Sequence, residues 1–239
     1  MGVFKDLHIL VTGGTRGIGA AVAEKFAVAG GDVTVTGAKR GGQPPSRRIS
    51  LEIVDFSDDV AMTEFVRTVR SRGFDVLVNC AGINVVAPFE KVDLADFDRV
   101  SRVNVRAPLL LCQAVLPHMR ERRWGRIVNI SSVYGHVSRE GRASYSTSKF
   151  GLDGMTAALA AEVARDGVLA NCVAPGFVDT DLTRSVLGEQ GMREMESRIP
   201  VGRLAAPAEI ARLVVWLGSR ENTYVSGQNI LIDGGFTRV

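Results

Sequence analysis

The chain has 239 residues, of which 46% are hydrophobic and 23% are charged, and its 29 basic and 26 acidic residues give a net charge of +3. This composition is that of a globular protein and excludes collagen-like, coiled-coil or disordered sequence as the main organisation. The charge is too balanced to indicate nucleic acid or an anionic membrane surface as a partner, and the length fits one domain covering residues 1–239.

Short apolar runs alternate along the chain with longer segments of helical period. Strands are predicted at Leu7–Thr12, Val33–Gly37, Ile49–Val54, Asp75–Asn79, Arg126–Ser131, Val168–Ala174 and Gln228–Ile232. Helices are predicted at Gly17–Ala29, Val60–Arg72, about Asp93–Arg122, Ala143–Ala164 and Pro207–Leu217. This alternation predicts the α/β class, a doubly wound Rossmann fold whose parallel sheet of about seven strands carries helices on both faces. The polar, Met-rich stretch 181–200 is expected to be a mobile flap.

Membrane insertion, disulfides and metal binding all lack a signal in this sequence. No apolar run approaches the ~20 residues of a membrane span, and the first residues do not resemble a signal peptide. The three cysteines, Cys80, Cys112 and Cys172, are far apart and form no CxxC or Cys/His cluster. We therefore expect a cytoplasmic protein with free thiols and no metal site.

The first predicted strand leads into a glycine-rich turn, Thr12-Gly13-Gly14-Thr15-Arg16-Gly17-Ile18-Gly19, which is followed directly by a helix. Glycines at such a turn permit close approach of the backbone to a pyrophosphate, and the helix N-terminus offers free N–H groups. The alternative is a tight strand–helix turn without a ligand. The context of strand, turn and helix at the start of an alternating chain favours a dinucleotide site.

The glycine spacing TGxxxGxG, at Gly13, Gly17 and Gly19, resembles that of the classical short-chain dehydrogenase/reductase family. Asn79-Cys80-Ala81-Gly82 resembles the family's NAG motif, with Cys80 where members usually carry Asn. Pro175-Gly176 and the C-terminal Ser226-Gly227-Gln228 and Asp233-Gly234-Gly235 also match in order. The resemblance covers essentially the whole chain and is greatest to the 3-oxoacyl-(acyl carrier protein) reductase group. It implies an oxidoreductase that interconverts a carbonyl and a secondary alcohol, with a homotetramer as the active form.

The cofactor preference depends on the end of the second strand, which reads Thr36-Gly37-Ala38-Lys39-Arg40 and contains no carboxylate. A carboxylate there would bind the ribose 2′-hydroxyl of NAD, whereas Arg16, Lys39 and Arg40 suit the 2′-phosphate of NADP. We expect NADP(H), with NAD(H) as the alternative, since Lys39 and Arg40 are otherwise solvated loop charges. The resemblance adds further cofactor-binding residues: Thr15, Ile18, Asp55, Phe56, Asn79, Ala81, Gly82, Pro175, Gly176, Val178 and Thr180.

Tyr145 and Lys149 lie four residues apart in a predicted helix and therefore share one of its faces. A nearby ammonium stabilises a phenolate, which makes tyrosine a better acid–base near neutral pH. Ser132 precedes Tyr145 by the family's spacing and ends the fifth strand, where it can hydrogen-bond a substrate carbonyl. Ser131 is the competing assignment for this serine. The resemblance also assigns both Tyr145 and Lys149 to cofactor binding.

Asn104 matches the family's fourth catalytic residue. Pro108, four residues later, has no N–H, so the Asn104 carbonyl lacks its usual helical partner. A carbonyl freed in this way can hold a water molecule, and we expect it to extend a proton relay from Lys149.

Arginines at two places in the sequence bear on the substrate, and each allows two interpretations. Arg142 is expected either to meet an anionic substrate or to be an exposed loop charge. The run Arg120-Glu121-Arg122-Arg123 is expected to end a solvated helix or, less strongly, to contact an acidic carrier protein. The preferred substrate is a 3-oxoacyl thioester, small or carrier-bound. The alternatives are a sugar, polyol or cyclic alcohol, or a dinucleotide-binding regulator without turnover.

Overall fold

A computed structural model of the chain describes residues 2–38, 46 and 49–239. Its strands are β1 His8–Val11, β2 Asp32–Gly37, β3 Ile49–Ile53, β4 Val76–Asn79, β5 Gly125–Ile130, β6 Val168–Pro175 and β7 Asn229–Ile232. They form one seven-stranded sheet in the order β3-β2-β1-β4-β5-β6-β7, in which every neighbouring pair is parallel. The predicted doubly wound sheet is therefore confirmed.

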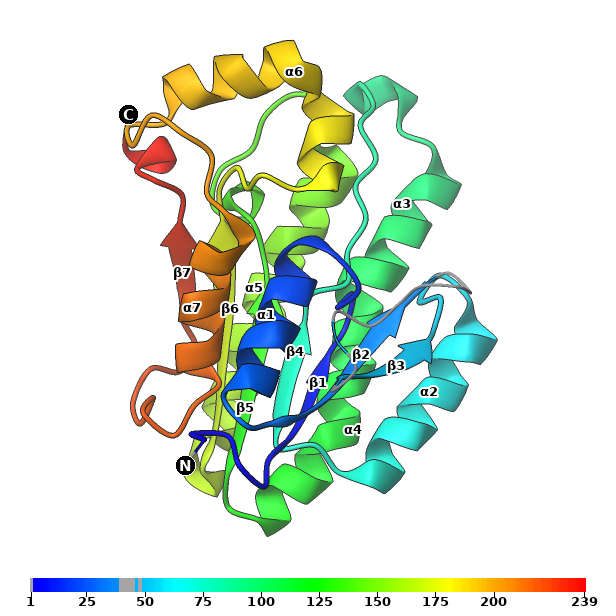
Figure 1. The fold of residues 1–239 in the computed structure, drawn as a ribbon. Coiled ribbons are helices and arrows are strands. Elements are labelled where there is room, and N and C mark those ends of the chain that lie inside the picture. Colours follow the sequence, from blue (N-terminus) through cyan, green and yellow to red (C-terminus); the bar gives the residue numbers. More distant parts are fainter. Residues whose placement is uncertain (1, 39–45, 47–48) are drawn as a thin grey trace.

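Helices cover both faces of the sheet (Figure 1). Their bounds are α1 Gly17–Val28, α2 Asp59–Arg72, α3 Leu94–Ser101, α4 Ala107–Glu121, α5 Ala143–Val163, α6 Asp181–Arg198 and α7 Pro207–Leu217. Helices α1 and α7 lie side by side on one face, and α2, α4 and α5 lie on the other. Within the described ranges, no helix is both long and apolar enough to cross a membrane.

Alternate residues of the central strands supply the two cores. In β1, Ile9 packs with Phe26 of α1 and Val214 of α7, whereas its neighbour Leu10 faces the opposite core with Leu111 of α4. Strands that are apolar on both sides are expected where helices cover both faces of a parallel sheet. The carboxyl ends of the strands thus share one edge, which is where doubly wound folds bind their ligands.

The predicted long helix about Asp93–Arg122 is helical throughout residues 94–121, with a local change in its hydrogen bonding. Between α3 and α4 lies a π-helical turn, Arg102–Arg106, in which the Ala107 N–H bonds to the Arg102 carbonyl. Pro108 lies in the first turn of α4, where its missing N–H is tolerated. The prediction of one long helical stretch is therefore confirmed, and the local change from α- to π-helical hydrogen bonding includes Asn104, four residues before Pro108.

The stretch 181–200, for which the sequence suggested only a flap, is mostly helical. Helix α6 covers Asp181–Arg198 and bends at Gly188, whose φ of 63° is outside the helical region. It lies beyond the carboxyl ends of the strands (Figure 1). Thr180 caps its first turn through a hydrogen bond from the Thr183 N–H to the Thr180 hydroxyl.

The start of α7 carries a pH-sensitive contact. Glu209 accepts hydrogen bonds from Arg203 Nη1 at 2.7 Å and Nη2 at 2.9 Å, and from the Ala206 N–H at 2.8 Å. The guanidinium first, and then the backbone amide, lower the pKa of the Glu209 carboxyl from 4.5 to about 2. The carboxyl is thus more acidic in the folded chain, so its contribution to stability is present above pH 4.5 and lost as the pH falls towards 2.

We therefore expect Glu209→Gln to lower the urea midpoint of unfolding at pH 7 and to have less effect at pH 3. The measurement is urea unfolding of both proteins at the two pH values. Glu64→Gln, an exposed position on α2, is the control and should give no such difference. Equal destabilisation by Glu209→Gln at pH 7 and pH 3 would show that the charge of Glu209 does not matter.

Candidate active site

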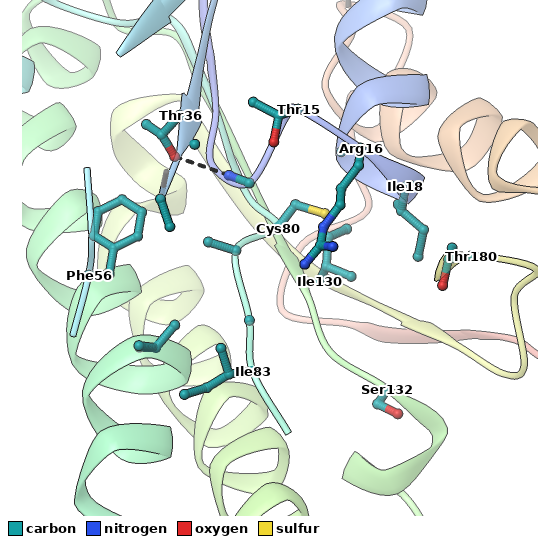
Figure 2. Close-up of a pocket in the computed structure, with 18 of the residues that line it drawn as sticks. Thr15, Arg16, Ile18, Thr36, Phe56, Cys80, Ile83, Ile130, Ser132 and Thr180 are labelled. Atoms are coloured by element: carbon teal, nitrogen blue, oxygen red, sulfur yellow. Dashed lines mark hydrogen bonds between the residues drawn. The ribbon is translucent and has the colours of Figure 1, made fainter. Parts of the chain in front are cut away.

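One cleft of about 490 Å³ runs along the carboxyl ends of the strands. It is lined by nearly all of the described residues that the sequence singled out: Gly13, Thr15, Arg16, Gly17, Ile18, Gly19, Asp55, Phe56, Ala81, Gly82, Ser132, Tyr145, Lys149, Pro175, Gly176, Val178 and Thr180. Figure 2 shows Thr36 and Ser132 at opposite ends of this cleft. Asn79 and Asn104 do not line it, and Lys39 and Arg40 lie outside the described residues.

The glycine-rich turn after β1 is fixed to its neighbours by short hydrogen bonds. The Thr12 hydroxyl accepts from the N–H groups of Cys80 and Ala81, both at 3.0 Å. The Gly13 N–H donates to the Thr36 hydroxyl at 3.1 Å, the bond dashed in Figure 2. Gly13 has a φ of +65°, and a Cβ there would lie 2.9 Å from the Ala81 Cα. Only glycine fits at this position, and its lack of a Cβ allows the turn after β1 to pack directly against Ala81, which follows β4.

The first turn of α1 offers unpaired donors to the cleft. No side chain caps this helix, its first turn has no acidic residue, and its N-cap is Arg16. In contrast, Asp58 caps α2 and Asp93 caps α3 with side-chain hydrogen bonds. An uncapped N-terminus that opens into a cleft is suited to a phosphate group. A Cβ on Gly19 would overlap the Gly13 carbonyl oxygen, so the helix also approaches the turn as closely as a dinucleotide site requires.

The end of the cleft that is expected to hold the adenosine is formed by residues that follow β2 and β3. Gly37 and Ala38 line the cleft at the end of β2, and the Arg16 side chain extends into it (Figure 2). Asp55 follows β3 and is held by Ser57, whose N–H and hydroxyl donate to its Oδ1 at 2.8 and 2.7 Å. No described residue at the end of β2 places a carboxylate in the cleft.

Ser132, Tyr145 and Lys149 come together at the other end. The Lys149 side chain is 4% exposed, donates from Nζ to the Ile130 carbonyl at 2.7 Å, and lies 5.6 Å from the Tyr145 ring centre. The Ser132 hydroxyl oxygen accepts from the Tyr134 N–H at 3.2 Å, which leaves its own proton available to donate. Ser131 instead donates to the Lys149 carbonyl at 3.4 Å. This geometry favours Ser132 over Ser131 as the residue that meets a substrate.

Asn104 is buried beside this group rather than in the cleft. It is 1% exposed, and its amide donates to the Ile83 carbonyl at 2.9 Å and to the Ser148 hydroxyl at 3.0 Å. A Cβ on Gly82 would lie 3.4 Å from Asn104 Oδ1 and 3.7 Å from Lys149 Nζ, so both side chains border the same small space. The structure therefore gives Asn104 a positioning role between the loop after β4 and α5. The water relay through its carbonyl stays a prediction.

Asn79 points into the protein. Its amide donates to Asn129 Oδ1 at 2.8 Å, and the Asn129 amide donates to the Thr156 hydroxyl at 2.8 Å. These hydrogen bonds join β4, β5 and α5 below the cleft. A structural contact is thus the role that the geometry supports for the Asn79 side chain.

The cysteines differ in position. Cys80 lines the cleft, and burial raises the pKa of its thiol to about 11. Cys112 and Cys172 are buried in the interior, and burial raises the pKa of each to about 12. Among the described residues, no cluster of His, Cys, Asp and Glu side chains is arranged to hold a metal ion.

The structure bears on the alternatives that were left open for the two arginine features. The run 120–123, at the end of α4, is exposed, as expected of a solvated helix end, and it also forms ion pairs: Arg120 and Arg123 with Asp166, and Arg122 with Asp75. These pairs lie near the starts of β4, β5 and β6, at the sheet edge opposite the cleft. These ion pairs give the three arginines partners within the chain, and the contact with an acidic carrier protein stays a prediction. Arg142, by contrast, is buried rather than an exposed loop charge.

Comparison with known proteins agrees with this architecture. A family model described as Enoyl-(Acyl carrier protein) reductase matches residues 13–237. The chain is 41% identical over 239 residues to 3-oxoacyl-[acyl-carrier-protein] reductase FabG of Aquifex aeolicus, covering 95% of each chain. It is 37% identical over 241 residues to acetoacetyl-CoA reductase of Cupriavidus necator, covering 94% of this chain and 96% of that one.

A solved structure shares the whole fold. The gluconate 5-dehydrogenase of Burkholderia cenocepacia in complex with NADP and tartrate is 29% identical, with a TM-score of 0.90 over 99% of this chain and 97% of that one. The full-length matches, the parallel seven-stranded sheet and the cleft at its carboxyl edge lead to one conclusion. The chain belongs to the short-chain dehydrogenase/reductase family and is a nicotinamide-dinucleotide-dependent ketoreductase.

Proposed function

We propose that this protein reduces the ketone of a 3-oxoacyl thioester to a secondary alcohol, reversibly, with NADP(H) as the cofactor and Tyr145 as the acid–base. The observation that supports it best is the meeting of Ser132, Tyr145 and Lys149 at one end of the cleft. The other end presents the glycine-rich turn and the uncapped start of α1, which suit the dinucleotide's phosphates.

Ser132 and Tyr145 have different roles in the proposed reduction of the ketone. A bound nicotinamide supplies a hydride to the carbonyl carbon during reduction, or accepts it during oxidation. Ser132 donates a hydrogen bond to the carbonyl oxygen, where negative charge develops. Tyr145 gives its phenolic proton to that oxygen, so the C=O bond becomes CH–OH and the tyrosine becomes a phenolate.

Lys149 then stabilises the phenolate. Its ammonium group is buried 5.6 Å from the Tyr145 ring centre, and the Ile130 carbonyl accepts one of its hydrogen bonds. Two further N–H bonds remain for the tyrosine and for the ribose hydroxyls of the cofactor. Val178 and Thr180, after β6, line the cleft where we place the contact with the nicotinamide carboxamide.

The substrate assignment follows the curated relatives, whose names specify 3-oxoacyl and acetoacetyl thioesters. A second candidate is the oxidation of a sugar-type hydroxy acid. It is favoured by the buried, unpaired Arg142 and by the likeness to the gluconate 5-dehydrogenase. A non-catalytic regulator is the third alternative, and the presence of Ser132, Tyr145 and Lys149 in one cleft opposes it.

The choice between NADP and NAD is tested by removing the cations near the end of β2. We expect Lys39→Ala with Arg40→Ala, and separately Arg16→Ala, to weaken NADPH binding about 10-fold or more while changing NADH binding little, because only NADPH carries the 2′-phosphate. Fluorescence titration with each cofactor measures both affinities. Equal losses for the two cofactors would place the 2′-phosphate elsewhere.

The proposed assembly is a homotetramer in the cytoplasm, with α4 and α5 supplying the main contact between two copies. Leu109 on α4 and Phe150 on α5 are large apolar side chains left exposed on this surface. Gly151 and Gly154 are exposed on α5, and a Cβ at Gly154 would meet nothing within 4 Å. Small residues on an exposed helix face permit close approach of another helix.

Substrate entry is proposed beside residues 181–200. Asp181 and Thr183, in the first turn of α6, line the cleft. The bend at Gly188 divides the helix, so the first turns can move without the rest. A flap of this kind would exclude water from the reacting ketone.

The deciding experiment follows the absorbance at 340 nm while the purified protein meets a 3-oxoacyl thioester, a cyclic ketone and a keto-sugar in turn, each with NADPH. We expect the fastest turnover with the thioester and its loss in Tyr145→Phe. Faster turnover of the keto-sugar would favour the second candidate. Tight cofactor binding without turnover of the thioester would contradict the proposed substrate.

A further inference from the structure

Arg142, the residue directly before α5, is a buried cation that no described residue neutralises. It is 7% exposed, and its Nη1 is buried without a hydrogen-bond partner. Among the described residues, no carboxylate forms an ion pair with it and no hydrogen bond holds its guanidinium group. A buried charge is unfavourable unless an opposite charge or an acceptor meets it.

Tyr134, which contacts this cation, also has a buried polar group without a hydrogen-bond partner. The Arg142 guanidinium carbon lies 5.6 Å from the centre of the Tyr134 ring, above its face. Tyr134 is 8% exposed, and its hydroxyl is also buried without a partner. An arginine can only donate hydrogen bonds, and it lies over the ring rather than at the hydroxyl. An acceptor oxygen from a ligand would suit both groups.

Tyr134, on which Arg142 is stacked, contacts two of the reacting residues. The Tyr134 ring meets the Tyr145 ring edge to face, with centres 6.4 Å apart, and its backbone N–H donates to the Ser132 hydroxyl. Arg142 precedes Tyr145 by three residues, about one helical turn. Neither Tyr134 nor Arg142 lines the cleft itself, so the guanidinium group has to turn towards the cleft to meet the atoms beside a ketone held between Ser132 and Tyr145.

We propose that Arg142, stacked on Tyr134, is a specificity-determining residue that donates a charge-assisted hydrogen bond to a second oxygen of the substrate, close to the reacting ketone. This assignment rests on the proposed ketoreductase function and deepens it. The chemistry required is an acyl oxygen beside the ketone, from either a thioester carbonyl or a free carboxylate. Among the residues that the structure describes, no hydrogen bond or ion pair fixes the guanidinium group, so it can turn towards a bound oxygen.

The test uses three substrates with a shared methyl ketone: the N-acetylcysteamine thioester of acetoacetate, acetoacetate itself, and butan-2-one, which lacks the acyl oxygen. For each, kcat/KM is measured with NADPH. We expect Arg142→Met to lower the ratio of thioester to butan-2-one about 10- to 100-fold, the value of a hydrogen bond from a charged group. A larger change with acetoacetate than with the thioester would identify the carboxylate as the preferred source, and the reverse the thioester.

Two variants control for folding and local charge. Arg142→Lys keeps the charge and should restore part of the ratio, while Arg139→Met removes a neighbouring exposed arginine of the same loop and should leave the ratio unchanged. NADPH affinity, measured for every variant, reports whether the fold is intact.

The proposal is overturned if Arg142→Met changes kcat/KM equally for all three substrates, which would make its role structural. It is also overturned if the variant dissociates the assembly in size-exclusion chromatography without changing the ratio, because Arg142 would then serve a contact between copies. Failure of the proposed function looks different: the unaltered protein would reduce none of the three compounds.

Discussion

Tyr145→Phe is expected to lower kcat by about 100- to 10,000-fold, the usual contribution of a positioned acid–base group. The substitution removes one hydroxyl and keeps the ring, so the edge-to-face contact with Tyr134 remains. NADPH affinity should therefore change little. Steady-state rates at 340 nm and a fluorescence titration with NADPH measure the two quantities on the same sample.

Tyr224→Phe is the matched control, since that tyrosine is 94% exposed and lies outside the cleft. It should leave both the rate and the affinity unchanged. Should Tyr145→Phe keep more than about a tenth of the activity, another group would have to supply the proton. A large loss of NADPH affinity in Tyr145→Phe would instead show that the main role of the phenol is to bind the cofactor.

Lys149→Met should lower kcat about 10- to 150-fold, because it removes a buried ammonium whose hydrogen bonds are those of a charged group. Methionine keeps much of the side-chain volume but leaves the Ile130 carbonyl without the partner that now lies at 2.7 Å. Some loss of stability is expected for that reason, and the thermal midpoint is to be measured alongside the rates.

The rate of the double variant shows whether Tyr145 and Lys149 act together in proton transfer or contribute independently. If Lys149 acts by stabilising the Tyr145 phenolate, the double variant Tyr145→Phe, Lys149→Met should be hardly slower than Tyr145→Phe alone. Lys91→Met, at an exposed position, is the control for removing a lysine. Fully multiplicative losses in the double variant would contradict a joint role for the two residues.

The fold could be predicted from the sequence because each strand and helix is indicated by the pattern of its own residues. Alternating apolar runs and helical segments require a parallel sheet covered on both faces, and the structure has one. The π-helical turn at Arg102–Arg106 escaped prediction, since its hydrogen bonds differ from those of an α-helix by a single residue. Helix α6 was not predicted as a helix either, because its glycines and its many polar residues are typical of a loop.

The site was predictable where a motif imposes geometry and less so where packing decides. Gly13 and Ser132 line the cleft as their spacing suggested. Asn79 carries a recognisable motif, yet its side chain turns towards Asn129, which only the neighbouring strand determines. The burial of Arg142 depends on Tyr134, eight residues earlier, and on no pattern that a single sequence displays.

We expect one cleft to bind the nicotinamide dinucleotide and to use Tyr145 to move a proton to a ketone. The most direct test is a single-turnover reaction of the NADPH-loaded protein with a 3-oxoacyl thioester, followed at 340 nm for the unaltered protein and for Tyr145→Phe. We expect rapid loss of absorbance with the unaltered protein and almost none with Tyr145→Phe, with NADPH bound equally by both. Equal single-turnover rates, or failure of the unaltered protein to bind NADPH or NADH, would contradict it.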